Sequence, residues 1–466
     1  MAHYLIAGGF GFIGTRLGIF LTSQGHQVSV ITRTPSKYAK VRPYPCEILA
    51  WNDPLEKLAA TIEQSEAIIN LCGDGIVDKD WSYSQKENLL SSRIQPIQAL
   101  RKACVHAQKQ PKCWIQASAI GIYGTSCPQP TTEEAPLPND FLSTLCQQWE
   151  QAAKENVPPQ TRLILLRIGI VLGEEGGFLA KMTPLYASSL GARLGSGKQK
   201  LSFIHIDDLV ALICTGLQNE QLHGFVNACA PHPCTGLEFH QAMQKFFGRL
   251  QAPIGVPKTA ISLVMGERTD LIFADQNILP QKAEQTGFTW SAPTIEAALA
   301  KVYTPIPYPT YGLILRDHTF LNAPVEEVWP FFSDAKNLEK ITPPWLKFNV
   351  LKQSTPNITE NTLIHYKLQL RGIPFRWITR ITDWQPGECF ADTQAKGPYA
   401  LWYHQHFFIP AGQQTIMVDR VVYRLPFQPL SGPLIGWYVK GDVEKIFTYR
   451  KQQIHRIYNT KENSRF

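Results

Sequence analysis

The sequence predicts two different folds in one chain: a doubly wound parallel α/β sheet, and after it an α+β domain with an antiparallel sheet. In the first part, short apolar runs alternate with segments whose apolar residues recur at helical spacing, and the connections between them are short. Beyond a proline-rich stretch, strand-like segments follow one another without helices between them and end in a long helical pattern. We expect domains at 1–302 and 311–466, joined by a linker at 303–310.

The first apolar run ends on three evenly spaced glycines. An expected strand at 4–7 leads into Gly8, Gly11 and Gly14, and residues 15–21 continue at helical spacing. Gly8 permits a tight turn, Gly11 lets the backbone approach a pyrophosphate, and Gly14 lets the helix pack on the strand. A glycine triplet alone is weak evidence, but the flanking strand and helix are the context that a dinucleotide site requires. The cofactor contacts expected from this turn are Gly8, Gly11, Phe12, Ile13 and Gly14, with the helix N-terminus facing the anion.

The end of the second expected strand indicates which dinucleotide is bound. Residues 27–31 lead into Thr32 and Arg33, and no acidic residue stands there to hold the ribose 2′-hydroxyl of NAD. A guanidinium suits a 2′-phosphate, so the sequence favours NADP over NAD. The alternative is an arginine at a solvated strand end.

Two further strand ends add expected contacts to the cofactor. The fourth strand, at 67–73, ends in small residues that let the nicotinamide half pass close to the backbone. The fifth strand, at 113–118, ends at the edge of the sheet where this type of fold places its reacting groups. The residues expected to contact the cofactor here are Leu71, Cys72, Gly73 and Ser118.

Composition narrows the class of protein. A formal net charge of +7 over 466 residues includes no basic run dense enough to indicate nucleic-acid binding. The ten cysteines show no CxxC pair or metal-ligand spacing, which favours reduced thiols and predicts no metal site. We expect a cytoplasmic protein without a signal peptide or membrane span, acting on a small molecule.

Several ordered motifs carry a family resemblance over residues 1 to about 300. The glycine turn, residues 70–73 and residues 118–124 resemble the extended short-chain dehydrogenase/reductases. Further blocks resemble an atypical NAD(P)-dependent epimerase-like branch, the "nucleoside-diphosphate-sugar epimerases"; they lie at 149–153, 167–173, 195–199, 204–209, 227–231 and 287–288. The resemblance implies an NADP-type Rossmann domain whose small C-terminal portion, at 225–300, covers a substrate. It implies no particular substrate.

The chemistry of this family usually depends on a tyrosine with a lysine four residues later, because the ammonium lowers the pKa of the phenol. The corresponding helix, 140–150, offers Phe141 and Leu145 in one register and Cys146 and Glu150 in the other. Neither register supplies the pair, so the sequence does not support the ordinary reductase mechanism.

Two hydroxyl groups remain as catalytic candidates. Ser118 ends the fifth strand, and Tyr123 follows five residues later as a possible proton donor. The alternatives are that Ala119 takes the usual serine position and that Tyr123 packs in the pocket floor. Cys146 as a nucleophile is a weaker hypothesis, since a lone helical cysteine is usually core.

A second group of motifs lies at 323–329, 337–338, 341–344, 397–398 and 402–408. They resemble the START-like helix-grip proteins (SRPBCC, polyketide cyclase-like), and the resemblance covers nearly all of 311–460. The resemblance implies a cavity for an apolar ligand. Inward polar candidates are His404, His406 and Arg420, and the alternative is a solvent-facing polar stripe. Zinc binding is disfavoured, because two histidines two apart give only two ligands of one sort.

The abundance of large rings in this second part supports a cavity, because rings can line a hollow. The alternative is that the rings simply fill the core. The rings are Trp329, Phe331, Phe332, Trp345, Trp377, Trp402, Phe408, Trp437 and Tyr438.

Together these observations predict an NADP-dependent oxidoreductase or epimerase-like protein that acts on an unidentified small molecule, fused to a hydrophobic-ligand-binding domain. The alternative from another class is a non-catalytic NADP-binding sensor or regulatory protein.

Overall fold

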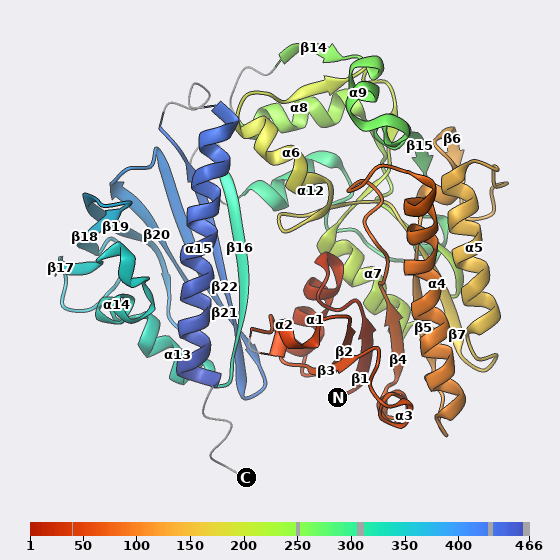
Figure 1. The fold of residues 1–466 in the computed structure, drawn as a ribbon, viewed down its shortest axis with the longest axis horizontal. Helices are drawn as coiled ribbons and strands as arrows, with labels where there is room; N and C mark the ends of the chain where they lie inside the picture. The colour runs from red at the N-terminus through yellow and green to blue at the C-terminus, as the bar shows by residue number, and fades with distance from the viewer. Residues whose placement is uncertain (40, 248–251, 305–311, 427–431, 460–466) are drawn as a thin grey trace. The chain divides into compact units, whose positions relative to one another are not determined.

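The computed structural model describes residues 1–39, 41–247, 252–304, 312–426 and 432–459, without the side chains of 252–254 and 432–438. They form two compact units (Figure 1). Unit 1 comprises Met1–Phe20, His26–Pro35 and Cys46–Pro307, and unit 2 comprises Leu21–Gly25, Ser36–Pro45 and Tyr308–Phe466. Residues 305–310 of the expected linker lie outside the described residues, so the domain limits stay a prediction.

Unit 1 is built on a seven-stranded sheet with the order β12-β7-β5-β4-β1-β2-β3, and all neighbouring pairs are parallel. The order reverses at β1, which pairs with β2 on one side and with β4 on the other; such a switch point is where ligands bind in doubly wound sheets. The predicted parallel α/β fold is confirmed. Its strands are β1 (His3–Ala7), β2 (Gln27–Thr32), β3 (Glu47–Ala50), β4 (Ala67–Asn70), β5 (Cys113–Ala119), β7 (Arg162–Ile168) and β12 (Gly224–Ala228).

Apolar residues on both sides of this sheet are covered by helices, and the central strands are nearly continuous apolar runs for that reason. Side-chain caps fix several helix starts: Ser82 accepts from the Gln85 N–H, and Asp140 accepts from the Ser143 N–H at 2.9 Å. The main helices are α1 (Phe12–Ser23), α3 (Leu55–Gln64), α4 (Tyr83–His106), α5 (Phe141–Asn156) and α7 (Ile206–Gln218).

Shorter elements complete unit 1. The helices are α2 (Pro35–Ala39), α6 (Gly177–Ala187), α8 (Gly236–Phe247), α9 (Lys258–Met265), α10 (Thr269–Ile272), α11 (Gln281–Gln285) and α12 (Ile295–Tyr303), with 3-10 turns at Ile120–Tyr123 and Gly266–Arg268. The strands are β6 (Ser126–Thr131), β8 (Ile170–Leu172), β9 (Ala192–Leu194), β10 (Lys200–Leu201), β11 (Phe203–His205), β13 (Cys234–Thr235), β14 (Ala252–Val256) and β15 (Asp275–Ile278). Within the described ranges, no helix has both the length and the apolar character needed to cross a membrane.

Unit 2 is a seven-stranded antiparallel sheet with the order β16-β22-β21-β20-β19-β18-β17, and the long helix α15 runs across it (Figure 1). This confirms the predicted helix-grip fold. The strands are β16 (Leu313–Leu321), β17 (Asn349–Gln353), β18 (Leu363–Leu370), β19 (Ile373–Gln385), β20 (Cys389–Lys396), β21 (Leu401–Ala411) and β22 (Gln414–Arg424). The helices are α13 (Val325–Phe332), α14 (Leu338–Ile341) and α15 (Gly432–Asn459), with 3-10 turns at Ala335–Asn337 and Pro344–Leu346.

Many of the large rings of unit 2 pack on one another. The Trp329 ring lies 5.1 Å from the Trp384 ring and 5.4 Å from the Phe408 ring, measured between centroids. These edge-on and tilted contacts are the favourable arrangements for aromatic pairs. The side chains of Trp437 and Tyr438 lie outside the described part, and the predicted cavity stays a prediction.

Two glycines of the first turn differ in what surrounds them, which gives a test of the fold. A Cβ at Gly14 would lie 2.6 Å from the Cα of Gly9, whereas a Cβ at Gly11 would meet only the Gly8 carbonyl oxygen, at 3.3 Å. We expect Gly14→Ala to lower the free energy of unfolding by about 1–3 kcal/mol, as overpacking does. Gly11→Ala should change it by less than about 1 kcal/mol. Urea denaturation of both variants checks this, and equal losses would contradict it.

Candidate functional site

The glycine turn between β1 and α1 has the geometry of a dinucleotide cradle. Gly8 has a φ of +80°, a conformation that favours glycine, and a Cβ there would press against the Leu71 backbone at 3.2 Å. The Gly11 N–H donates to the Gly8 carbonyl at 3.0 Å, and the Gly11 carbonyl accepts from the Thr15 N–H as α1 begins. Gly14 packs against the turn itself, but the Cβ direction of Gly11 is open apart from one oxygen. The residues present therefore fit a pyrophosphate at Gly11.

A second glycine-rich loop, Gly173–Gly177, surrounds Phe12 at the start of α1. A Cβ at Gly173 or at Gly176 would lie 2.8 Å from an atom of the Phe12 ring, and one at Gly177 would lie 3.3 Å from it. The ring therefore fixes the helix N-terminus against the segment that starts α6. The sequence analysis did not predict this contact between Phe12 and the loop at 173–177.

Arg33 follows the carboxyl end of β2 and extends into solvent. Its side chain is 78% exposed, and Nη1 lies 3.4 Å from Oδ1 of Asp74. An exposed pair of this kind contributes at most about 1 kcal/mol, so it does not hold the guanidinium away from a ligand. Beside it, the Thr32 hydroxyl accepts from the Thr34 N–H at 3.3 Å, which shapes the turn that carries Arg33.

Hydrogen bonds fix the end of β4 next to the glycine turn. The Leu71 N–H donates to the Ala7 carbonyl at 2.9 Å, and the Cys72 N–H donates to Oδ1 of Asn70 at 3.1 Å. Burial raises the pKa of the Cys72 thiol to about 12, so the group stays protonated at neutral pH. A Cβ at Gly73 would meet the Arg93 side chain at 3.5 Å, an ordinary contact. The backbone of 71–73 therefore lies beside the glycine turn, and its contact with the cofactor stays a prediction.

Ser118 and Tyr123 belong to one buried polar network. The Ser118 hydroxyl donates to Oε1 of Glu150 at 2.8 Å, and Arg167 binds both oxygens of Glu150 at 2.9 Å. Arg167 Nη1 also donates to the Tyr123 oxygen at 2.8 Å, and the Tyr123 hydroxyl donates to Oδ1 of Asn227 at 2.7 Å. All five residues are buried. Both candidate hydroxyls thus have protein partners, and their catalytic role stays a prediction.

Burial keeps the Tyr123 phenol and the nearby Cys146 thiol protonated at neutral pH. Burial raises the pKa of Tyr123 to about 12, although the guanidinium of Arg167 acts in the opposite direction. Burial, with Glu150 nearby, also raises the pKa of the Cys146 thiol to about 12, which does not favour a thiolate nucleophile. At neutral pH, Tyr123 is therefore a neutral phenol beside a cation.

Sequence reasoning did not identify Arg167, Glu150 and Asn227 as members of a site. Each lies in a motif that carried the family resemblance, but the three residues come from three different elements: Arg167 from β7, Glu150 from α5 and Asn227 from β12. The contact between Tyr123 and Asn227 spans 104 positions of the chain. Such partners follow from the strand order, which the motifs alone do not give.

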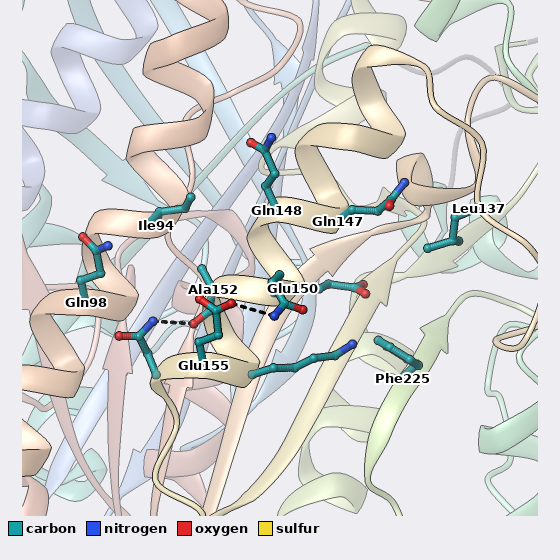
Figure 2. A pocket seen from close by; sticks show the side chains of 12 residues that line it. Ile94, Gln98, Leu137, Gln147, Gln148, Glu150, Ala152, Glu155 and Phe225 are labelled. Atoms are coloured by element: carbon teal, nitrogen blue, oxygen red, sulfur yellow. Dashed lines mark hydrogen bonds between the residues drawn. The ribbon is translucent and has the colours of Figure 1, made fainter.

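An opening in unit 1 lies elsewhere, between α4 and α5. It has a volume of about 570 Å³, and Figure 2 shows its mostly polar lining, with Gln147, Gln148 and Glu155 on α5. Phe225 closes one side, and Glu150 reaches it from the buried network. No residue of the glycine turn lines it. We therefore assign the cofactor to the turn and not to this opening.

In unit 2, the structure brings His404 and His406 together on the face of the sheet that carries α15. Their ring centroids lie 3.8 Å apart, and both rings are buried. Arg420 is not with them, because the register pairs it with Gln405, whose Oε1 accepts from Arg420 Nη1 at 2.6 Å on the opposite face. Asp419, which pairs with His406 across the strands, takes the place expected for Arg420.

Charges around the two histidines are tightly coupled. Burial, with His406 adjacent, lowers the pKa of His404 to about 4, so this ring is neutral at pH 7. Burial alone would raise the pKa of Asp419, but Arg450 and the two histidines hold it well below its usual range. Asp419 is therefore a carboxylate.

Comparisons with known proteins agree with this geometry. The model of the NAD dependent epimerase/dehydratase family matches residues 4–228, and a domain of unknown function, DUF1731, matches 256–302. "Epimerase family protein SDR39U1" of Homo sapiens is 32% identical over 303 residues, which are 64% of this chain and 98% of the human protein. The chain belongs to the epimerase family. "Epimerase family protein ML0860" of Mycobacterium leprae is 34% identical over 302 residues, 64% of this chain and 95% of that protein.

Solved structures of this family share the fold. The human SDR39U1 structure, crystallised with NADPH, has a TM-score of 0.57 at 31% identity and covers 65% of this chain and 100% of its own. A nucleoside-diphosphate sugar epimerase from Corynebacterium glutamicum has a TM-score of 0.51 at 26% identity, covering 65% of this chain and 58% of its own.

The second part of the chain has its own match. The family described as "Polyketide cyclase / dehydrase and lipid transport" matches residues 321–447, so the predicted START-like resemblance is confirmed. Location is not determined by these relatives, since one from Arabidopsis thaliana is named as chloroplastic. The cytoplasmic location stays a prediction.

The buried ion pair of unit 1 can be tested by removing one partner. We expect Glu150→Ala to lower the free energy of unfolding by about 3–5 kcal/mol, because Arg167 would remain charged and buried. Glu155→Ala, on the same helix but exposed, should change it by no more than about 0.5 kcal/mol. Urea denaturation of both variants measures the difference, and similar small losses would contradict the assignment.

Proposed function

We propose that residues 1–302 bind NADP(H) and act on an unidentified small molecule by hydride chemistry, and that residues 311–466 bind a hydrophobic ligand. The observation that carries the nucleotide part is the glycine turn: Gly8 and Gly14 are constrained by the protein itself, whereas Gly11 is open toward the place of a pyrophosphate. The NADPH in the related human structure agrees with this cofactor.

The choice of NADP over NAD rests on Arg33. It is the exposed cation at the end of β2, and its present partner, Asp74, belongs to a weak surface pair. A 2′-phosphate would offer the guanidinium two or more charge-assisted hydrogen bonds. The ribose of NAD offers no anion, so the gain applies to NADP alone.

Bound NADPH would supply a hydride, and the residues of the chain would bind and orient the reactants. Ser118 and Tyr123 remain the proposed polar groups for the proton. With its pKa raised to about 12, Tyr123 would act as a proton donor and not as a base, and Arg167 would stabilise the phenolate that remains.

A second candidate function has its own support. The Tyr-Lys pair of ordinary reductases is absent, and both hydroxyls already donate to protein acceptors in a buried network. These features favour an NADP-binding sensor that does not catalyse. The enzyme and the sensor would both bind NADP(H), but only the enzyme would oxidise NADPH.

For the second unit, support comes from its fold and its interior. The sheet and α15 enclose apolar clusters on both sides of the two histidines, with Phe332 and Phe408 in one and Val421 and Phe447 in the other. An interior of this kind, with few polar groups, suits an apolar ligand.

Cofactor choice is tested by Arg33→Ala. We expect the variant to bind NADPH more weakly by about 1.5–3 kcal/mol, the value of a lost charge-assisted contact, with little change for NADH. Lys109→Ala, which removes one exposed positive charge elsewhere, should change neither. Calorimetric or fluorescence titration measures both, and an equal effect on the two cofactors would show that Arg33 does not bind the 2′-phosphate.

Catalysis is tested by Tyr123→Phe and Ser118→Ala. If these groups move the proton, each variant should lower turnover by about 10²-fold or more while NADPH affinity stays within twofold. The assay follows NADPH oxidation against a panel of carbonyl and enone compounds. Tight NADPH binding by the wild-type protein without oxidation by any of them would favour the sensor.

A further inference from the structure

A cluster of charged and polar side chains lies inside the otherwise apolar core of unit 2. It consists of Asp392 on β20, His404 and His406 on β21, Asp419 on β22 and Arg450 on α15. Apolar clusters flank it along α15, with Ile454 on one side and Phe447 on the other. Buried charged side chains destabilise the fold unless each has a partner. The geometry of this cluster therefore shows which of its members are paired and which are not.

The Asp392 carboxylate faces both histidines but forms no hydrogen bond with any described residue. Its Oδ2 lies 3.6 Å from Nδ1 of His404 and 3.5 Å from Nε2 of His406. Ligand atoms about 2.0–2.1 Å from a tetrahedral metal ion lie about 3.3–3.4 Å from one another. The three side chains each offer one ligand atom within 4.8 Å of the others. The spacing is therefore long for direct hydrogen bonds and close to that around a shared ion.

The other nitrogen of each histidine faces Asp419. His404 Nε2 lies 3.0 Å from Oδ1 of Asp419, and His406 Nδ1 lies 2.8 Å from the same oxygen, although its N–H is not aligned on it. A carboxylate behind a metal-binding histidine usually holds the ring N–H and thereby directs the free lone pair to the metal. Here Asp419 is hydrogen-bonded to His404 Nε2 and lies beside His406 Nδ1, and the remaining nitrogens, His404 Nδ1 and His406 Nε2, are the ones that face Asp392.

The charges of the cluster leave room for a cation. Arg450 Nε lies 3.4 Å from Oδ2 of Asp419 and balances that carboxylate. Lys451, the next residue on α15, forms an ion pair with Asp317, and its Nζ lies 2.6 Å from Oδ1. Asp392, whose side chain is only 14% exposed, therefore lacks a partner of opposite charge among the described residues.

We propose that Asp392, His404 and His406 bind one divalent transition-metal ion, with Asp419 as a positioning residue. Two imidazoles select Zn²⁺ or a similar transition metal over Mg²⁺ and Ca²⁺, which take oxygen ligands. Three protein ligands leave a coordination position open to water or to a ligand of the cavity. The sequence alone disfavoured zinc because it showed two ligands; the third comes from the neighbouring strand, where Asp392 pairs with His404.

The experiment uses the full-length protein, freed of metal with a chelator, and titrates it with Zn²⁺ by calorimetry and with Co²⁺ by visible absorption. We expect one Zn²⁺ per chain and the intense visible bands of four- or five-coordinate Co²⁺. Asp392→Asn should weaken Zn²⁺ binding at least 100-fold. Asp419→Asn should weaken it 10- to 100-fold, as loss of a carboxylate behind the ligands does, while the Co²⁺ bands remain at higher metal concentration.

Asp442→Asn is the matched control, because it removes a carboxylate from an exposed pair with Arg371 in the same unit. It should leave Zn²⁺ affinity unchanged. The Asp392 side chain makes no hydrogen bond with a described residue, so Asp392→Asn should keep the far-ultraviolet circular dichroism of the wild-type protein. Absence of the Co²⁺ bands and of stoichiometric Zn²⁺ binding in the wild-type protein overturns the proposal, whatever the variants do. Equal affinity in Asp392→Asn and Asp442→Asn overturns it as well. NADPH titration of the same samples reports on the nucleotide proposal separately.

Discussion

The ion pair between Glu150 and Arg167 is the constraint on which the site of unit 1 depends. Both side chains are almost fully buried, and their two parallel hydrogen bonds join α5 to β7. Charges in such a place are tolerated only when each has its partner, so the pair fixes how the helix lies on the sheet. The Ser118 hydroxyl donates to Glu150, and Arg167 donates to the Tyr123 oxygen. The ion pair therefore also fixes the positions of these two hydroxyl groups. The lysine of the Tyr-Lys pair of ordinary reductases is absent, and the buried ion pair of Glu150 with Arg167 lies beside the two hydroxyls instead.

Buried charges in unit 2 also need partners of opposite charge. Asp419 is balanced by Arg450 and approached by two histidines, and Asp317 is balanced by Lys451. Asp392 has no lysine or arginine partner among the described residues, and one ring nitrogen of each histidine faces it. In unit 1 the buried charges of Glu150 and Arg167 neutralise each other, which suits a pair that holds structure. In unit 2 one negative charge remains, which suits a group that holds a cation.

Much of the fold could be predicted from the sequence, because local patterns determine it. The strands expected at 4–7 and 27–31 are β1 and β2, and the glycine turn follows β1 as expected, since apolar periodicity and glycine spacing are local signals. The register in which two strands pair cannot be predicted from the sequence of either strand alone. Arg420 and Asp419 are adjacent in sequence, and a shift of one position decides which of them shares a face with His406. Asp392 came into the cluster only through the pairing of β20 with β21, and Asn227 met Tyr123 only through the strand order of unit 1.

The lengths of the relatives bear on why the two units are joined. The human epimerase family protein is matched over 98% of its length by 303 residues of this chain, and the family models place that match at 4–228 and 256–302. A nucleotide-binding protein of this family is therefore complete without a helix-grip unit. The glycine cradle, Arg33 and the buried network all lie within unit 1, and the histidine–aspartate cluster lies within unit 2. The proposed nucleotide site and the proposed metal site therefore each draw their residues from one unit.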